Sequence, residues 1–246
     1  MGRDDRVQSL KLTLTTEERQ ALNSASWFAT LPAVLRHDVL TSATVRRFKR
    51  GDMIFSRGKP IDSLMACAAG VVRLSHELPS GREMTLNYVP AGRWFGELPL
   101  PRNGCRSHDA FAHEATTVIV LGSAELKQIL DRHPQLYATL LEVQTLQLRQ
   151  FLSLVEDFVD RPVRGRLARQ LTNLMRRYGI QTPGGCGIRL GIRIDQSELA
   201  RLIGSSRQRV NEELGAIRRA SVIRRDSAGW VVIDPDRLLQ IAETNC

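Results

Sequence analysis

The chain has 246 residues, of which 42% are hydrophobic and 25% charged, a composition typical of a globular protein with one large domain or two of ordinary size. No apolar run approaches the roughly 20 residues that a membrane-spanning helix needs. The first thirty residues also lack the apolar stretch of a signal peptide. These features exclude a membrane span, and we expect a cytoplasmic protein.

The net charge of +9 is concentrated near the C-terminus. Residues 161–225 contain fifteen arginines, no lysine and four acidic residues, a net charge of +11, so the rest of the chain carries −2. A basic module joined to a nearly neutral one is typical of a protein that binds a polyanion. Because this module has few exposed aromatic residues to stack on single-stranded bases, we expect duplex DNA rather than RNA.

Residues 45–122 predict a β-rich domain. Glycines separate short apolar segments there, and this spacing favours a barrel or a sandwich. The predicted strands include residues 53–55, 71–74, 84–86 and 118–121. Pro79–Gly81 is a plausible hairpin turn. Before this domain, a short helix is predicted after Thr15 and Thr16.

A helical stretch begins near Ser123, pauses at His133-Pro134 and continues to about Val159. One line of side chains recurs in alternating steps of four and three residues, the pattern of a coiled-coil seam with one polar position. It consists of Leu141, Thr145, Leu148, Leu152, Val155 and Val159. A second line, suited to face the β-rich domain, consists of Leu140, Phe151, Leu154 and Phe158. Two apolar lines favour a homodimer over a single amphipathic helix packed on its own domain.

The pair Arg161-Pro162 ends that helix, because proline disfavours helical backbone in the residue before it. A new helix is predicted from Val163 to Tyr178. A glycine-rich loop over 183–187 and an alternating strand over 188–194 follow.

Residues 195–235 predict a helix-turn-helix with a wing. Asp195 and Glu198 can cap a first helix, and Gly204 can end it. Its apolar face consists of Leu199, Ala200 and Ile203. Residues 205–208 predict a second capping box, and the buried stripe of the next helix consists of Val210, Leu214 and Ile217. A hairpin with its turn at 226–229 then forms the wing, and Pro235 begins a last short helix.

The N-terminal end of the second helix enters the major groove in such modules. Arginine donates two hydrogen bonds to guanine, so Arg207 is the expected base contact, with Gln208 and Glu212 as neighbours that could read adenine or cytosine. Ser205, Ser206 and Arg209 are better placed for phosphates. The full expected DNA-binding set is Ser205, Ser206, Arg207, Gln208, Arg209, Asn211 and Glu212, with Arg224 and Arg225 in the wing.

The order of these segments resembles the family of cyclic-AMP receptors and fumarate–nitrate regulators (CRP/FNR). The resemblance covers about residues 27–242. Its marks are the glycine-spaced β-region, Gly92–Leu98, the long helix, Arg166–Ala168 and Ile203–Asn211. It implies an α+β fold with an N-terminal β-roll of the cyclic-nucleotide-binding type, a long dimerisation helix and a C-terminal winged helix-turn-helix. The corresponding parts are an N-terminal extension (1–26), an effector domain (27–132), a dimerisation helix (133–160) and a DNA-binding domain (161–246).

The resemblance also implies a homodimeric transcription regulator that binds two-fold symmetric operators and contacts RNA polymerase. In nucleotide-binding members, a Gly-Glu-Leu segment and a following Arg-Ser hold the cyclic phosphate and the ribose. The resemblance places this effector site on Gly96, Glu97, Leu98, Arg106 and Ser107. A guanidinium group suits phosphate because it can bind it bidentately.

This chain departs from that pattern in three places. Pro99 and Pro101 remove amide donors from the loop. His108-Asp109 brings charge to where a purine would lie, and Phe151-Leu152 takes the place of a Thr-Ser pair on the long helix. Cyclic AMP, another nucleotide such as cyclic GMP or cyclic di-GMP, and no nucleotide or an unknown effector are therefore the open alternatives. The last of these would make the protein a constitutive DNA-binding regulator with a vestigial pocket.

Other kinds of site have weaker support. Ser107, His108 and Asp109 have the residue types of a hydrolytic triad, but adjacent residues cannot orient as nucleophile, base and orienting acid. A metal-dependent enzyme is the remote alternative, and its metal ligands could come from His76, His108, His113 and Glu114. The three histidines could also bind a haem. No HxH or HExxH pattern joins these residues. The spacing of Cys67, Cys105, Cys186 and Cys246 favours reduced thiols over a metal or redox centre. We therefore expect a protein that is not an enzyme and holds no metal.

Overall fold

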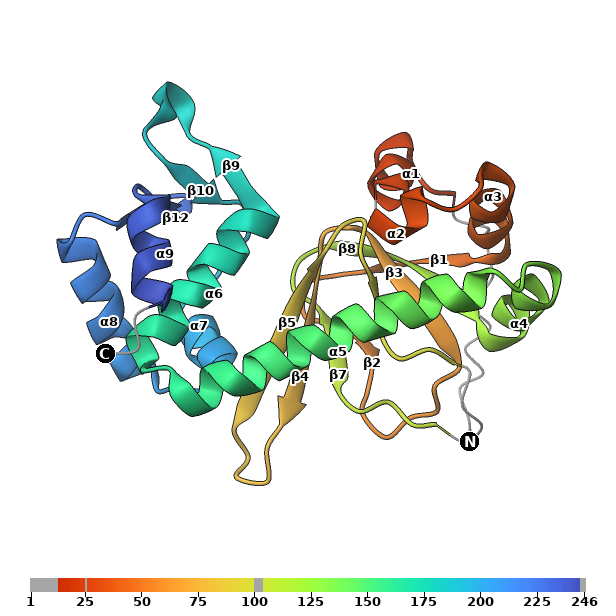
Figure 1. The fold of residues 1–246 in the computed structure, drawn as a ribbon, viewed down its shortest axis with the longest axis horizontal. Coiled ribbons are helices and arrows are strands. Elements are labelled where there is room, and N and C mark those ends of the chain that lie inside the picture. The colour runs from red at the N-terminus through yellow and green to blue at the C-terminus, as the bar shows by residue number, and fades with distance from the viewer. Residues whose placement is uncertain (1–12, 25, 100–103, 244–246) are drawn as a thin grey trace, which may run out of the picture. The chain divides into compact units, whose positions relative to one another are not determined.

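The computed structural model describes residues 13–24, 26–99 and 104–243 (Figure 1). These residues form two compact units. One contains the described residues up to Ser75 together with Tyr88–Val143, and the other contains His76–Asn87 and the residues from Gln144 onward. None of the helices in these ranges is long and apolar enough to cross a membrane.

The β-domain is a sandwich of two four-stranded sheets. The sheet with the order β1-β8-β3-β6 contains β1 (Thr44–Phe48), β8 (Thr116–Gly122), β3 (Ser63–Ala69) and β6 (Trp94–Phe95). The sheet with the order β2-β7-β4-β5 contains β2 (Met53–Phe55), β7 (Asp109–Ala112), β4 (Val71–Glu77) and β5 (Glu83–Pro90). The turn predicted between β4 and β5 is confirmed, because the amide of Gly81 donates to the carbonyl of Leu78 at 2.9 Å. The structure thus confirms the predicted β-rich domain.

Strand β3 separates two hydrophobic cores, because side chains alternate between the two faces of a strand. Met65 and Cys67 point into the core between the two sheets. Leu64, Ala66 and Ala68 belong to a second core on the other side of their sheet. Burial on both faces explains why the sequence of this strand is a continuous apolar run and does not alternate between apolar and polar residues.

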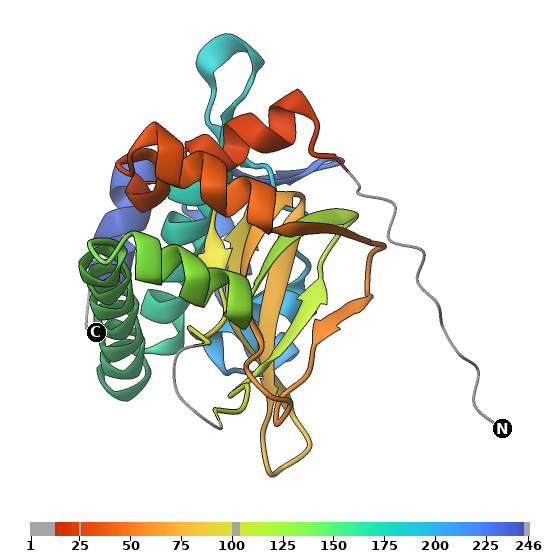
Figure 2. The ribbon, with the colours of Figure 1, turned by 90° about the vertical axis from the view of Figure 1, so that its right-hand side faces the viewer.

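Helices cover that second core. They are α1 (Thr16–Asn23), α2 (Ser26–Ala29), α3 (Ala33–Ser42) and α4 (Ser123–Arg132). Figure 2 shows the red and orange helices lying along one side of the strands. The helix predicted after Thr15 is confirmed as α1, whereas α2 and α3 were not predicted. Helix α3 follows Pro32 and has no side-chain hydrogen bond at its N-cap, so the capping signal that identifies α1 is missing there.

The cap of α1 also attaches it to the sheet. The Thr15 hydroxyl accepts from the amide of Glu18 at 3.2 Å, and the Glu18 carboxylate accepts from the amide of Thr15 at 2.8 Å. Glu18 is buried and pairs with Arg47 of β1 at 3.0 Å. Burial alone would raise the pKa of Glu18, but hydrogen bonds from Thr15, Thr117 and Arg47 together lower it. A charged contact therefore fixes the N-terminal helix on β1.

The long helix α5 (Leu136–Asp160) follows α4 after the pause predicted at His133-Pro134. Of the second apolar line, Leu140 is buried in the helix-covered core, as expected, whereas Phe151 is exposed. Phe158, expected to face the β-domain, instead lies against Gly204 of the C-terminal module. The difference arises because the last turn of α5 belongs to that module and not to the β-domain.

The C-terminal module is a winged helix-turn-helix. Its helices are α6 (Val163–Tyr178), α7 (Gln196–Ile203), α8 (Arg207–Arg219) and α9 (Pro235–Glu243), with a single 3-10 turn η1 (Pro183–Gly185). Its sheet has the order β11-β12-β10-β9 and contains β11 (Ile223–Asp226), β12 (Gly229–Val232), β10 (Ile188–Leu190) and β9 (Gly179–Gln181). Helix α6 has the bounds that the sequence predicts. The strand predicted over 188–194 is too long. β10 ends at Leu190, opposite Gly179, because the chain before Gly179 belongs to α6 and offers no further partner strand.

Candidate nucleic-acid interface and effector site

The turn between α7 and α8 fixes how the two helices of the helix-turn-helix cross. The Asp195 carboxylate accepts from the amide of Glu198 at 2.8 Å, and the Glu198 carboxylate accepts from the amide of Asp195 at 2.7 Å, which confirms this capping box. Gly204 ends α7 with a φ of 61°, the left-handed conformation that glycine adopts most readily. Ala200 and Val210 are buried between the helices, as expected.

Helix α8 begins one residue later than the sequence predicts. Ser206, not Ser205, is its N-cap, and the Ser206 hydroxyl accepts from the amide of Arg209 at 3.1 Å. The amide of Ser205 instead donates to the carbonyl of Ala200 at 3.0 Å and completes the end of α7. The capping box predicted over 205–208 is therefore wrong. Either of the two adjacent serines could serve as an N-cap. Because the amide of Ser205 is used to end α7, Ser206 becomes the N-cap of α8.

Arg207, at the first position of α8, is exposed, and its side chain makes no hydrogen bond or ion pair with any other residue that the structure describes. It lines a small pocket together with Asp195, Gln196, Ser197 and Arg225. Arg225 is an exposed wing residue whose guanidinium carbon lies 5.3 Å from the centroid of the Trp230 ring. Two arginines from separate elements thus border one pocket, an arrangement suited to a phosphate group or a base edge.

The neighbouring polar residues of α8 bind one another. Glu212 accepts from Gln208 at 3.2 Å and from Arg209 at 3.3 Å. Arg209 also pairs at 3.1 Å with Glu213, which is buried and pairs with Arg164 of α6 at 2.6 Å. These contacts direct the Arg209 side chain along the helix toward Glu212 and Glu213.

Glu213 is not among the residues that the sequence predicts to form the site. A signal was available, since Glu213 stands three residues after Val210 and next to Leu214, within the buried stripe of α8. A buried acid in such a stripe needs a basic partner. Asn211, a predicted DNA-binding residue, accepts from Gln196 of α7 at 2.8 Å and so links the two helices.

The wing carries the two other arginines expected to contact DNA. Arg224 pairs with Asp226 at 3.4 Å, and Arg189 of β10 reaches the same carboxylate oxygen at 2.5 Å. The hydrogen bond from Arg189 lowers the pKa of Asp226 below its ordinary value. Arg224 is thus engaged inside the wing, whereas Arg225 borders the pocket that Arg207 lines.

In the β-domain, the residues of the expected effector site gather around Arg106. The Arg106 side chain is 1% exposed, donates to the carbonyl of Ser63 at 2.7 Å and pairs with Glu97 at 3.3 Å. Its guanidinium carbon lies 4.4 Å from the centroid of the Phe55 ring. A Cβ at Gly96, whose φ is +81°, would come within 2.8 Å of the Arg106 guanidinium. The predicted site residue Leu98 packs against the helix-covered core.

Glu97 connects Arg106 with the residues that follow it. One carboxylate oxygen accepts from the amide of Ser107 at 2.8 Å and from its hydroxyl at 2.7 Å, and lies 3.4 Å from Nδ1 of His108. Burial alone would raise the pKa of Glu97, but hydrogen bonds from His108 and Ser107 outweigh it and hold the pKa well below its usual range. Arg106 therefore faces an ionised carboxylate.

The metal and redox alternatives gain no support from the described residues. In that part of the chain, no group of three or more His, Cys, Asp or Glu side chains is placed to hold a metal ion. Cys67 is buried between the sheets, and burial raises the pKa of its thiol to about 12, which disfavours the reactive thiolate. Pro101 and Cys246 lie outside the described residues.

Comparisons with known proteins agree with this arrangement. Residues 45–133 match the cyclic nucleotide-binding domain, and residues 165–241 match the Crp-like helix-turn-helix domain. The chain is 30% identical over 195 residues to a CRP-like cAMP-activated global transcriptional regulator of Mycobacterium tuberculosis, covering 79% of this chain and 86% of that protein. It is 31% identical over 216 residues to the global nitrogen regulator of Synechocystis, covering 85% and 94% of the two chains.

The fold has solved counterparts as well. The structure of FixK2 from Bradyrhizobium japonicum aligns with a TM-score of 0.71 at 17% identity, over 83% of this chain and 99% of that chain. This likeness concerns the fold, whereas the two sequence relatives and the two matched domains identify a family of transcription regulators rather than enzymes. The chain therefore belongs to the CRP/FNR family of DNA-binding transcription regulators.

Proposed function

We propose that this regulator binds DNA as a homodimer through α5, and that its two α8 helices read the two halves of a palindromic operator. In helix-turn-helix dimers the recognition helices enter successive major grooves about 34 Å apart. The protein would act in the cytoplasm, where the chromosome is, and would contact RNA polymerase to promote or obstruct transcription.

The observation that carries the proposal is an apolar stripe on the surface of α5. Its members are Leu141, Leu148, Leu152, Val155 and Val159, which are 56–83% exposed. A contiguous exposed apolar surface is unfavourable in water and marks an interaction site. With Thr145 at the position between Leu141 and Leu148, the stripe repeats in steps of four and three residues, so a second copy of the same helix can cover it by coiled-coil packing.

The DNA roles follow from the contacts at the start of α8. Arg207 reads a base, because its guanidinium is exposed and no described residue binds it. Gln208 and Glu212 read neighbouring bases as a hydrogen-bonded pair. Arg225 binds a phosphate from the wing, beside the same pocket.

The effector proposed for the β-domain is an anion that binds at Arg106, with cyclic AMP, cyclic GMP and cyclic di-GMP as candidates. Its phosphate would replace Glu97 on the guanidinium, and Glu97 would then accept a hydrogen bond from a sugar hydroxyl. Support comes from the match to a cyclic nucleotide-binding domain and from the cAMP-activated relative.

A second candidate is a constitutive regulator that needs no effector. The observation that favours it is that Arg106 is already satisfied, by the Ser63 carbonyl and the Glu97 carboxylate, with Asp62 at 3.7 Å. Its buried positive charge is therefore balanced without a ligand.

The test is fluorescence anisotropy of the purified full-length protein on DNA fragments selected from a random pool. Each titration is run without a nucleotide and with cyclic AMP, cyclic GMP or cyclic di-GMP. Tight palindrome binding that one nucleotide sharpens identifies the effector, whereas binding that ignores all three supports the constitutive regulator. An absence of sequence-selective binding under every condition would refute the operator-binding function.

A further inference from the structure

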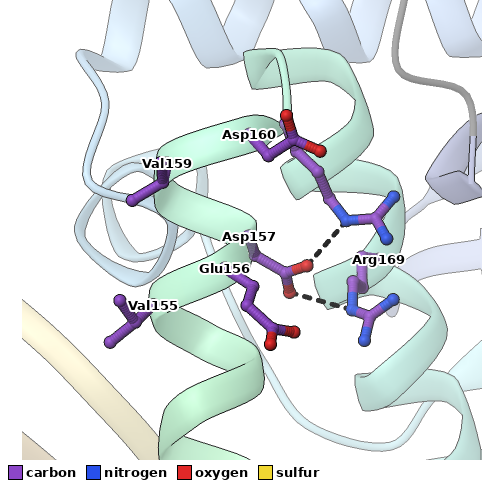
Figure 3. A pocket seen from close by; sticks show the side chains of 7 residues that line it. Val155, Glu156, Asp157, Val159, Asp160 and Arg169 are labelled. Atoms are coloured by element: carbon purple, nitrogen blue, oxygen red, sulfur yellow. Dashed lines mark hydrogen bonds and ion pairs between the residues drawn. The ribbon is translucent and has the colours of Figure 1, made fainter.

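The junction of α5 and α6 holds a charged cluster that DNA contact does not use. Asp157, in the last turn of α5, is 6% exposed, and each of its carboxylate oxygens binds a different arginine. Nε of Arg161 lies 2.6 Å from one oxygen, and Nε of Arg169 lies 2.8 Å from the other (Figure 3). Hydrogen bonds between two charged groups are short and strong, and losing one partner leaves a buried charge unbalanced.

The two arginines tie this carboxylate to different parts of the C-terminal module. Arg161, in the link after α5, also donates to the carbonyl of Ala242 near the end of α9. Arg169 stands on α6 and also donates to the hydroxyl of Ser153, one turn earlier on α5, at 3.0 Å. Through Asp157, the end of α5 is therefore fixed to α6 and, by way of Arg161, to α9.

A second group of contacts links the same turn of α5 to the helix-turn-helix. Arg166 donates to the carbonyls of Phe158 and Arg161 at 3.3 and 3.2 Å, and its guanidinium carbon lies 5.4 Å from the centroid of the Phe158 ring. The Phe158 ring lies against Gly204, so close that a Cβ there would come within 2.6 Å of it. The last turn of α5 thus contacts the turn that precedes the recognition helix, and the angle between α5 and α8 depends on this junction.

We propose that Asp157 is a positioning residue for DNA binding, because its bonds to Arg161 and Arg169 fix the angle between α5 and the recognition helix. In a dimer built on α5, that angle sets the distance between the two recognition helices and hence the half-site spacing that an operator must have. The inference rests on the dimer proposed above.

Figure 3 shows why Asp157 can be changed without changing the dimer seam. Val155 and Val159 point away from one side of α5, whereas Asp157 points from the other side toward α6. Glu156 is exposed and makes no ion pair with any residue in the described ranges. It supplies a matched control, since Glu156→Gln removes the same charge one residue away.

The test compares full-length wild type, Asp157→Asn and Glu156→Gln on one set of DNA duplexes. The set contains the operator selected with the wild type and versions in which the half-sites are one or two base pairs closer or further apart. The readout is the ratio of affinities for the best and the altered spacings. We expect this ratio to fall by about tenfold or more in Asp157→Asn, within the usual range of coupling between two sites, and to stay at the wild-type value in Glu156→Gln. A variant that is only less stable would keep the ratio, because a smaller active fraction weakens all duplexes equally.

Arg169→Gln is the second variant, since it breaks the same contact from a partly exposed residue. It should lower the ratio in the same direction, and the double variant should lower it no further than Asp157→Asn does. The proposal is overturned if both single variants keep the affinity ratio of the wild type. If Asp157→Asn does not fold, a wild-type affinity ratio in Arg169→Gln alone overturns it. A wild type that is monomeric or indifferent to spacing would overturn the proposed dimer function, and this inference with it.

Discussion

Replacing Leu148 and Leu152 by glutamate should convert the protein from a dimer to a monomer. The two leucines are 60% and 56% exposed and occupy consecutive positions of the repeating stripe on α5. A partner helix would bury the rest of both side chains, and glutamate at these positions would bring charge into an apolar seam. The folded monomer should be largely unaffected, because neither side chain is buried in it.

The magnitude follows from the area still exposed. Full burial of a leucine contributes about 1.5–3 kcal/mol, so burying the remaining part of each contributes about 1–2 kcal/mol. Four such leucines in a dimer contribute about 4–8 kcal/mol. At about 1.4 kcal/mol per factor of ten, the dimer dissociation constant should rise by roughly three to six orders of magnitude.

Sedimentation equilibrium of the wild type and the double variant measures this constant, and circular dichroism verifies that the variant is folded. Leu146→Glu is the matched control, since Leu146 lies on the same helix and is 57% exposed but stands outside the repeating stripe. It should leave the dimer intact. A folded double variant that dimerises like the wild type would refute the seam, and a Leu146 variant that dissociates would show that another face of α5 forms the contact.

Three further predictions concern the two candidate sites and the turn. Arg207→Ala should weaken operator binding by about 1–3 kcal/mol and flatten discrimination at one base pair; an equal loss on all sequences in anisotropy titrations would assign Arg207 to a phosphate instead. The lowered pKa of Glu97 means that its ionised form stabilises the fold at neutral pH and that this contribution is lost as the pH falls below the ordinary value of 4.5. Urea unfolding should therefore show a smaller loss of stability on acidification in Glu97→Gln than in the wild type, and equal losses would contradict the assignment. Gly204→Ala should destabilise the fold by at least about 1–2 kcal/mol, because it places a Cβ at positive φ and against the Phe158 ring; an unchanged thermal midpoint would contradict it.

The sequence by itself determined the features whose signals lie within a few residues. Proline placed the pause after α4 and the break after α5, because it restricts the residue before it. A short helix after Thr15 and Thr16 and the capping box of α7 were readable from a few adjacent side chains, and Gly204 from the conformation that a helix end requires. The family resemblance was readable for the same reason, since its marks are short segments in a fixed order.

The tertiary structure alone decided which of two equivalent local signals is used. Ser206 rather than Ser205 caps α8, and β10 ends at Leu190 although the apolar alternation continues. In the first case the carbonyl of Ala200, at the end of α7, takes the amide of Ser205, and in the second the partner strand β9 begins only at Gly179. A serine or an apolar alternation by itself carries no information about where such partners lie.

The partners in the charged clusters could not be identified from local spacing, because the fold brings them together from distant parts of the chain. Arg106 meets the carbonyl of Ser63, 43 residues away, and Arg164 meets Glu213, 49 residues away. In residues 161–225 only the arginine excess was visible in the sequence, and it predicted a polyanion partner for Arg164, Arg169 and Arg207 alike. In the structure, Arg164 and Arg169 of α6 pair with the buried acids Glu213 and Asp157, because a carboxylate that has lost its hydration needs a positively charged partner, whereas Arg207 stays exposed.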